Sequence, residues 1–226
     1  MRRLGPGLRY GLLVAAGRGM RYGAYKQFVP LLGRPVFIHG AQVFDGSRLM
    51  VGFAVVVPPH RIHDVRRMLA AHHIRKAIDV VAGGAERTES VRRGLSALPE
   101  NGWVAVHDAA RPLINSRMLA HGFLACRKSG AASFGFPVSD TIKLVRGPRI
   151  IRTVNRERLI AVQTPQFFKI ELLRRAHESA RRARLSATDD CALVERLGVK
   201  PVWIPGPRTN LKVTTQEDMR VIQALM

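Results

Sequence analysis

The stretch GLLVAAGRGMRYGAYKQF, residues 11–28, joins a short apolar run to a glycine-containing turn, and a Lys-Gln pair follows. The apolar run GLLVA has the length of a buried strand, so the turn would stand at the strand's carboxyl end. Ligands of parallel sheets bind at that edge, and glycines let backbone N–H groups approach an anion closely. Residues 15–26 are therefore a candidate phosphate-binding loop, with Arg21 and Lys26 as flanking positive charges.

Two common phosphate motifs do not fit this loop. The dinucleotide fingerprint needs a third glycine at position 22, where the chain has Tyr22, and the Walker A motif needs a Gly-Lys-Ser/Thr triplet that does not follow the first glycines. The residues alone leave two interpretations open. Either the loop holds phosphates that gain negative charge during a reaction, or it is a glycine turn with two exposed basic side chains.

Outward from this loop, short β-branched runs alternate with longer helical patterns along the 226 residues. This rhythm predicts one α/β domain, residues 1–226, with a Rossmann-like, mostly parallel sheet and helices on both faces. The expected strands are GLLVA (11–15), FAVVV (53–57), AIDVV (77–81), WVAVH (103–107), ASFGF (132–136) and VWIP (202–205). The expected helices cover about 60–72, 88–98, 117–129, 170–184, 189–197 and 215–225.

One stretch breaks the alternation. Residues 140–165, DTIKLVRGPRIIRTVNRERLIAVQTP, hold two β-rich runs around Arg146-Gly147-Pro148 where the rhythm calls for a helix. This pattern predicts an inserted β-hairpin arm over 140–162. Isolated two-stranded ribbons are marginally stable, so the arm needs a surface to pack against.

The formal net charge of +21 raises the possibility of a nucleic-acid partner. Lysine supplies only seven of the 37 basic residues, and no basic tract is interleaved with aromatics. The densest arginine run, residues 174–184, shares its segment with apolar residues at helical spacing, which indicates the solvated face of an amphipathic helix. These features argue against nucleic acid as the partner.

Cysteine and hydropathy patterns favour a cytoplasmic protein. Cys126 and Cys191 lie far apart in expected helices, without a CxxC motif or a nearby histidine pair, so we expect buried, reduced thiols rather than a metal site. No apolar run of 18 or more residues predicts a membrane span, and GLLVAA is too short for the apolar region of a signal peptide.

A series of motifs adds a specific resemblance to these patterns. After AAGRGMR and KQ come GGAERTESVRRGL, VHDAARP, FPVSDTIK, TVNRERL, QTPQFF, TDDCALVE and NLKVT, in that order. From about residue 11 to its end, the chain resembles the 2-C-methyl-D-erythritol 4-phosphate cytidylyltransferase family. The resemblance implies that CTP and a polyol phosphate are joined, with release of pyrophosphate and with Mg²⁺ or another divalent cation as cofactor. HDAARP and QTPQFF at compatible spacing make the likeness much more specific than the glycine loop alone.

The resemblance also implies residue roles. Arg21 and Lys26 would stabilise the five-coordinate transition state, and Asp108, which follows the strand WVAVH, would hold the metal. Without the resemblance, Asp108 could equally be a helix cap or a turn residue. The implied catalytic residues are Arg21, Lys26, Arg156 and Lys212; the CTP-binding residues are Ala15, Ala16, Gly17, Gly19, Arg21, Lys26, Gly84, Ser90 and Ala109; the polyol-phosphate residues are Asp108, Thr141, Arg156, Thr164 and Lys212.

The family's arm crosses to a second subunit, so the resemblance implies a homodimer in which Thr141 and Arg156 complete the partner's site. Three features depart from the family's usual pattern: the short bridge YGAY (22–25) before Lys26, Ala85 in place of an acid, and Thr209 in place of an acid. A sister enzyme for another polyol phosphate, such as ribitol 5-phosphate, is the nearest alternative function. A basic nucleic-acid-binding module is a more distant one.

Overall fold

The computed structural model describes residues 7–17, 19, 22–23 and 25–226. Its described residues form a seven-stranded sheet in the order β11-β7-β10-β6-β1-β4-β5, in which only β10 runs antiparallel to its neighbours. The strands are β1 (Arg9–Val14), β4 (Gly52–Val57), β5 (Ala77–Ala82), β6 (Trp103–Asp108), β7 (Ala131–Pro137), β10 (Ile160–Lys169) and β11 (Val202–Pro205). The expected α/β fold with a mostly parallel sheet is confirmed.

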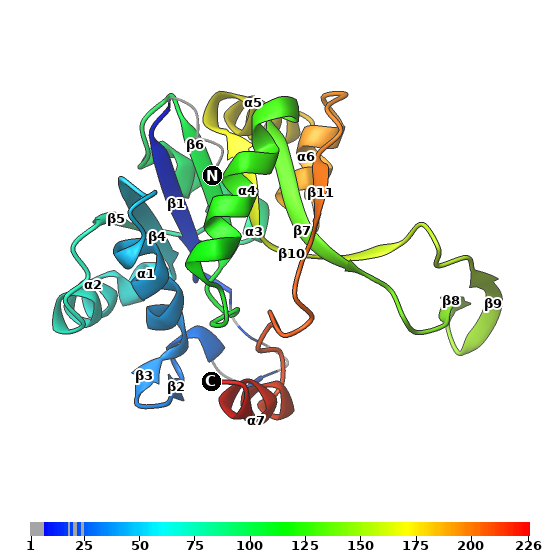
Figure 1. The fold of residues 1–226 in the computed structure, drawn as a ribbon, viewed down its shortest axis with the longest axis horizontal. Helices are drawn as coiled ribbons and strands as arrows, with labels where there is room; N and C mark the ends of the chain where they lie inside the picture. Colours follow the sequence, from blue (N-terminus) through cyan, green and yellow to red (C-terminus); the bar gives the residue numbers. More distant parts are fainter. Residues whose placement is uncertain (1–6, 18, 20–21, 24) are drawn as a thin grey trace.

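Helices cover both faces of this sheet (Figure 1). The helices are α1 (Val36–Gly46), α2 (Ile62–Ala71), α3 (Arg87–Ser96), α4 (Ser116–Ser129), α5 (Ile170–Arg182), α6 (Asp190–Glu195) and α7 (Gln216–Ala224). Neighbouring residues of β1 show the division, because Leu13 belongs to an apolar cluster that includes residues of α1, α2 and α4, whereas Leu12 belongs to one that includes residues of α3, α5 and α6. Alternate residues of a strand point to opposite faces, so both faces of this central strand are apolar.

The carboxyl edge of the sheet has its own small apolar cluster. Met219 and Ile222 of α7 pack with Leu31 of β2 (Pro30–Leu31) and with Ala110, which follows β6. In Figure 1, α7 accordingly lies beside β2 and β3 (Arg34–Pro35), below the ends of the central strands. The carboxyl-terminal helix thus brings residues 210–215 to the edge where the candidate phosphate loop lies.

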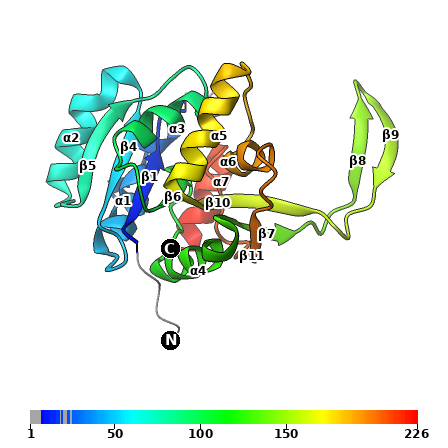
Figure 2. The same cartoon turned by 90° about the horizontal axis from the view of Figure 1, so that it is seen from above.

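The expected arm stands apart from the rest of the molecule. Strands β8 (Ile142–Arg146) and β9 (Arg149–Val154) pair only with each other in the described sheets, and the hairpin projects sideways from β7 and β10 (Figures 1 and 2). Gly147 turns the chain between them with a φ of 56°, a conformation that glycine adopts without strain. The apolar side chains of Val145 and Ile150, which face each other across the hairpin, are 58% and 65% exposed.

Two elements differ from the sequence-based expectation. Residues 36–46 form helix α1, which the sequence pattern does not predict, and residues 160–169 form the long strand β10, although the pattern assigns residues 160–162 to the arm. β10 enters the main sheet between β6 and β7, so the arm ends before it. The other expected strands and helices are confirmed to within a few residues.

Two smaller expectations concern side chains. Four of the five arginines in residues 174–184 lie on an exposed face, as predicted, but Arg174 is half-buried and its Nη2 donates to Leu95 O and Leu98 O at 2.5 and 2.8 Å. Arg174 therefore ties α5 to the end of α3 instead of facing solvent.

Cys126 and Cys191 are buried and free, as expected. None of the helices that the structure describes is both long enough and apolar enough to span a membrane.

Candidate active site

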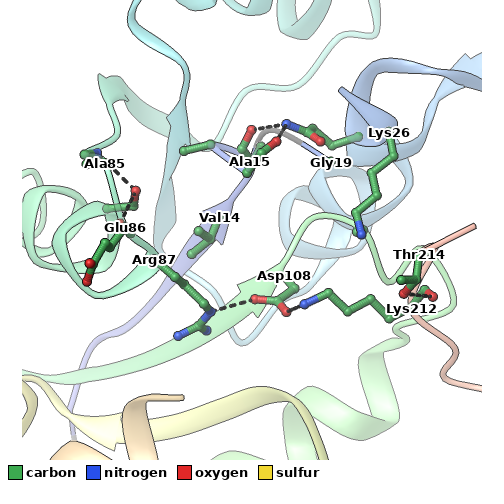
Figure 3. Close-up of a pocket in the computed structure, with 16 residues that line it drawn as sticks. Val14, Ala15, Gly19, Lys26, Ala85, Glu86, Arg87, Asp108, Lys212 and Thr214 are labelled. Atoms are coloured by element: carbon green, nitrogen blue, oxygen red, sulfur yellow. Dashed lines mark hydrogen bonds and ion pairs between the residues drawn. The ribbon is translucent and has the colours of Figure 1, made fainter. Parts of the chain in front are cut away.

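A cavity of about 440 Å³ lies at the carboxyl ends of β1, β5 and β6 (Figure 3). The loop after β1 forms one wall, the turn into α3 a second, and the segment before α7 a third. Its lining residues are Val14, Ala15, Ala16, Gly17, Gly19, Lys26, Gln27, Gly84, Ala85, Glu86, Arg87, Ser90, Asp108, Ala110, Lys212 and Thr214. The cavity therefore brings together residues from both ends of the chain and from its middle.

The loop after β1 is held from within by Gln27. This buried side chain donates from Nε2 to Ala15 O at 2.6 Å and to Gly17 O at 2.9 Å. Gln27 belongs to the short 3₁₀ turn Lys26–Phe28, so the same turn that shapes the loop also presents Lys26. In Figure 3, the Lys26 amine extends toward the side of the cavity that holds Asp108 and Lys212.

The turn after β5 fits closely against this loop. A Cβ at Gly83 would collide with Ala16 Cβ and Ser90 Oγ, so only glycine allows the two segments to approach. The Ser90 hydroxyl accepts from Gly84 N at 3.1 Å and donates to Glu86 O at 2.9 Å. Ser90 therefore fixes the backbone of the turn that forms this wall of the cavity.

Asp108, the last residue of β6, lies between two cations. Arg87 Nε donates to its Oδ1 at 3.1 Å, and Lys212 Nζ donates to its Oδ2 at 2.5 Å (Figure 3). Burial alone would raise the pKa of Asp108, but the two cations outweigh burial and hold the pKa well below its ordinary value. Asp108 is therefore ionised, and the side chains that contact it carry a net positive charge.

Arg87 connects this carboxylate to a second one. Its Nη1 donates to Asp190 Oδ2 at 2.7 Å, and the other oxygen of Asp190 lies 3.0 Å from His177 Nε2. Asp190 and His177 are each 1% exposed. Burial would lower the pKa of Arg87, but the two carboxylates reverse that effect and raise it. The third nitrogen, Nη2, is buried and has no hydrogen-bond partner among the residues that the structure describes.

A second cavity, of about 380 Å³, adjoins the first. Arg87, Asp108 and Lys212 line both cavities, so this ion-paired cluster stands at their junction. The second cavity is completed by Arg111, Val162, Gln163, Thr164, Gln166, Thr188, Asp189, Ala192 and Glu195. Two ligands lying in the two cavities would therefore meet at the charged cluster.

The wall of the second cavity is tied to β6 through Thr164. Its Oγ1 accepts from Asp108 N at 3.0 Å and lies 3.2 Å from His107 Nδ1, while His107 Nε2 lies 2.9 Å from Arg111 O. Burial lowers the pKa of His107 to about 4, so the ring is neutral at pH 7. A neutral ring that donates from Nε2 and accepts from the Thr164 hydroxyl satisfies both contacts.

The structure brings most of the expected site residues together. Ala15, Ala16, Gly17, Gly19, Lys26, Gly84, Ser90, Asp108 and Lys212 line the first cavity, and Thr164, Asp108 and Lys212 line the second. Ala109 is buried and does not line the first cavity, whereas its neighbour Ala110 does. Thr141 and Arg156 lie exposed at the base of the arm, outside both cavities, where Arg156 Nη1 donates to Ser139 O. Arg21 lies outside the described residues.

The short bridge before Lys26 ends at Tyr25, whose ring contacts the rings of His60 and Phe28. Tyr25 packs edge-on against His60, with ring centroids 5.5 Å apart, and also contacts Phe28 at 6.3 Å. Arg61 stacks over Phe28, with its Cζ atom 4.6 Å from the ring centroid. Tyr25 is therefore anchored by side-chain packing where the short bridge meets Lys26.

The other two departures lie away from the charged cluster. Ala85 contributes its backbone N–H to Glu89 Oε2 at 3.1 Å, so an acidic side chain still lies beside this turn. Thr209 is exposed, whereas its neighbour Asn210 is fully buried and donates to Thr164 O at 2.9 Å.

The charged cluster suits a divalent cation that is shared with substrate phosphates. Mg²⁺ in phosphate-transfer sites takes one or two carboxylates, with phosphate oxygens and water at its remaining positions. Asp108 offers one carboxylate at the junction of the cavities, and the described residues contain no group of three or more His, Cys, Asp or Glu side chains that could hold a metal by themselves. The residues therefore fit a cation that arrives with a phosphorylated ligand.

Sequence reasoning missed three residues of the site: Arg87, Gln27 and Asp190. A signal existed for Arg87, which is the first residue of α3. Cations are unfavourable at helix N-termini, so an arginine there indicates a nearby anion. Gln27 and Asp190 belong to the motifs KQ and TDDCALVE, but nothing in the sequence shows that their side chains hold a loop and an arginine.

Comparisons with known proteins agree with this geometry. The family model described as 2-C-methyl-D-erythritol 4-phosphate cytidylyltransferase matches residues 10–226. A protein of that name from Halalkalibacterium halodurans is 37% identical over 222 residues, covering 97% of each chain, and one from Desulforamulus reducens is 40% identical over 220 residues, covering 95% of this chain and 94% of the other. The crystal structure of the Thermus thermophilus protein of that name aligns with a TM-score of 0.76 at 35% identity, covering 96% of this chain and 98% of the other.

Proposed function

The chain belongs to the 2-C-methyl-D-erythritol 4-phosphate cytidylyltransferase family, and from this premise we propose how its two cavities divide the reaction. The protein is a nucleotidyltransferase that joins CTP and 2-C-methyl-D-erythritol 4-phosphate in the non-mevalonate pathway of isoprenoid biosynthesis. The products are 4-diphosphocytidyl-2-C-methyl-D-erythritol and pyrophosphate. We propose that the first cavity binds CTP and that the second binds the polyol phosphate.

The observation that carries this assignment is the cluster shared by the two cavities. The reaction requires an oxygen of the acceptor phosphate to approach the α-phosphorus of CTP, so the two ligands must meet at a point rich in positive charge. Arg87, Asp108 and Lys212 lie at the junction of the cavities. Lys212 would then orient the acceptor phosphate, while Asp108 keeps the lysine in place.

Positive charge near the triphosphate is the second part of the proposal. Catalysis of nucleotidyl transfer is mainly positioning and stabilisation of charge, with little covalent work for the protein. Lys26 lines the CTP cavity, and its turn is fixed by Gln27. We propose that Lys26 and Arg21 stabilise the five-coordinate transition state, while the backbone from Ala15 to Gly19 holds the triphosphate.

The cytosine ring would lie on the wall formed by the turn after β5. Gly84 and Ser90 line that end of the cavity, and backbone groups there can read the edge of a base. Because the Ser90 hydroxyl already holds Gly84 and Glu86, we propose that Ser90 acts mainly by shaping the turn.

Asp108 is the residue that would hold Mg²⁺. The cation supplies charge neutralisation and orientation of the triphosphate when it is bound. Both oxygens of Asp108 are paired with cations in the structure, so a bound cation would compete with Arg87 or Lys212 for this carboxylate.

The arm supports a homodimer. Thr141 and Arg156 lie at its base, away from the cavities of their own chain, and the exposed apolar side chains of the hairpin need a surface to cover them. We propose that the arm, residues 140–159, packs on a second copy and that Thr141 and Arg156 bind that copy's polyol phosphate. We also propose that residues 1–226 form a single nucleotidyltransferase domain and that the protein is cytoplasmic.

The decisive experiment is an acceptor comparison. Purified protein is incubated with CTP, Mg²⁺ and either 2-C-methyl-D-erythritol 4-phosphate or ribitol 5-phosphate, and released pyrophosphate is measured. We expect release with the methylerythritol phosphate and little with ribitol 5-phosphate. Preference for ribitol 5-phosphate would reassign the acceptor of the second cavity, and no release with either acceptor would contradict the transferase activity on which the division of the cavities rests.

A further inference from the structure

The proposed function gives no separate role to Arg87 of the charged cluster. Its hydrogen bonds go to two carboxylates of the chain itself, Asp108 and Asp190. We propose that Arg87 is a positioning residue, which sets the orientation of the Asp108 carboxylate, and that the buried pair Asp190 and His177 holds Arg87 in turn. The inference rests on the proposed role of Asp108 at the junction of the cavities.

The first step is the fork geometry of Arg87. Nε contacts Asp108 at 3.1 Å and Nη1 contacts Asp190 at 2.7 Å, so two nitrogens of one planar group are aimed at two different carboxylates. A guanidinium is rigid and planar, and fixing two of its nitrogens therefore fixes the whole group. The position of Asp190 thus determines where Arg87 presents Nε to Asp108.

The second step is the support behind Asp190. His177 of α5 lies 3.0 Å from Asp190 Oδ1, and the backbone N–H of Asp190 donates to Gln166 Oε1 at 3.1 Å. Asp190 is the first residue of α6, whose N-cap Asp189 accepts from Ala192 N at 3.0 Å. The carboxylate that holds Arg87 is therefore fixed by α5, α6 and β10 together.

The third step is the electrostatic cost of this arrangement. Arg87 opens α3, where the helix dipole disfavours a cation, and burial disfavours its charge further. A buried ion pair gives little net stability, because desolvation offsets much of the attraction between the charges. A cluster of this kind therefore contributes little as a stabilising element, whereas it does give Asp108 a defined orientation.

Asp190 and His177 make the proposal testable, because neither residue lines either cavity. Their substitution therefore replaces no residue that lines either cavity. Among the side chains that Asp190 contacts, Arg87 is the one that reaches Asp108, so the proposal predicts that a loss of turnover in such variants passes through Arg87.

The principal variant is Asp190→Asn, which keeps the shape of the side chain but removes the charge that holds Arg87. We expect kcat with CTP and 2-C-methyl-D-erythritol 4-phosphate to fall about 10-fold or more, as for partners that orient a metal-binding group. The KM for CTP should stay within about twofold, because the triphosphate loop is untouched. If Asp190 is only structural, the melting temperature falls while kcat per folded molecule is unchanged, and that result would overturn the proposal.

Arg87→Lys serves as a second variant in case Asp190→Asn does not fold. A lysine keeps the charge, but its single nitrogen cannot hold both carboxylates in a fork. The Arg87→Lys variant should likewise show a lower kcat and an unchanged KM for CTP.

His177→Gln, which retains a hydrogen-bond donor toward Asp190, should keep more activity than His177→Leu. Equal activity of these two variants would contradict the role of His177.

A double mutant separates coupling from independent damage. In an Arg87→Met background, Asp190→Asn should lower kcat no further, since the group through which Asp190 acts is gone. If the two substitutions lower kcat by factors that multiply, Asp190 acts by another route, and that result would overturn the proposal.

The matched control is Glu178→Gln. Glu178 is next to His177 on α5 and forms only exposed pairs with Arg181 and Arg182, so this variant should leave kcat unchanged. The wild-type assay establishes the activity itself, so failure of the proposed function would appear there first.

Discussion

Lys212 Nζ lies 2.5 Å from Asp108 Oδ2, so a residue close to the carboxyl end of the chain neutralises a carboxylate at the end of the central strand β6. The two residues are 104 positions apart, and α7 brings them together by packing against the loop that follows β6. The site is thus completed only when the carboxyl-terminal segment has folded onto the sheet.

This contact leads to the first prediction. Lys212→Ala should lower kcat by about 10² and raise the KM of the acceptor more than that of CTP, because an electrostatic donor is lost at the junction of the cavities. Steady-state kinetics with each substrate varied in turn will measure both effects. Lys128→Ala, which removes an exposed lysine of α4, is the matched control and should behave as the wild type. Equal changes in the two KM values would contradict the placement of Lys212 between the substrates.

The second prediction concerns the charges around the triphosphate. Lys26→Ala and Arg21→Ala should each lower kcat by about 10² or more, since each removes a charge that stabilises the transition state. Single-turnover measurements at saturating CTP will separate this loss from weaker binding. Near-normal turnover in both variants would remove the two residues from the catalytic role.

The regular part of the fold is predictable from the sequence for a physical reason. β1, β4 and β6 are buried on both faces and read as continuous apolar runs, while α2, α4 and α5 show a clear apolar stripe. Because parallel strands end at one edge of a sheet, these runs also place Asp108 and the glycine loop together there.

The two missed elements carry weaker signals. Helix α1 buries Phe37, Gly40, Ala41 and Phe44 at helical spacing, but two of these four residues are glycine and alanine, and Pro35 at its N-cap gives no side-chain cap. β10 carries buried polar residues and Pro165 where its register with β7 shifts, a composition that argues against a central strand. Tertiary contacts are what identify β10 as part of the main sheet.

The cluster around Asp108 shows a similar limit. Lys212 and Asp108 could be assigned because the family resemblance covers both motifs. The link from Arg87 to Asp190 joins residues 103 positions apart, and no local pattern specifies a hydrogen bond over that separation.

The third prediction tests the support of the triphosphate loop. Gln27→Glu keeps the side-chain shape but replaces the donor toward Ala15 O and Gly17 O with an acceptor, so the carbonyl groups would face a carboxylate. We expect the Kd for CTP to rise about 10-fold and the free energy of unfolding to fall by about 1–3 kcal/mol, the cost of unsatisfied buried groups. CTP binding by calorimetry and denaturant unfolding measure these effects. Gln42→Glu alters an exposed amide paired with Arg34 and serves as the control. A variant that binds CTP as the wild type does would show that Gln27 does not shape the loop.

The fourth prediction concerns the two cysteines. Burial raises the pKa of the Cys126 thiol to about 12 and raises that of Cys191 as well, so neither forms the reactive thiolate at about pH 8. Native protein should therefore react with a disulfide reagent only slowly, whereas protein in guanidinium should react rapidly at both thiols. Rapid modification of the native protein would contradict the buried position of at least one of them.

The last prediction tests the arm as a dimer contact. Val145 and Ile150 face each other across the hairpin and are mostly exposed, so a charged residue at position 150 would place a charge in the centre of any interface formed there. Ile150→Glu should shift the protein toward the monomer in sedimentation velocity, with a concentration dependence that the wild type lacks. Activity should fall in parallel, because Thr141 and Arg156 would no longer reach a second copy's site, and raising the protein concentration should restore part of it by mass action. Ile78→Glu, an exposed isoleucine of edge strand β5 far along the sheet, controls for the added charge and should change neither property. A wild-type protein that is fully active as a monomer would contradict both the dimer and the shared site.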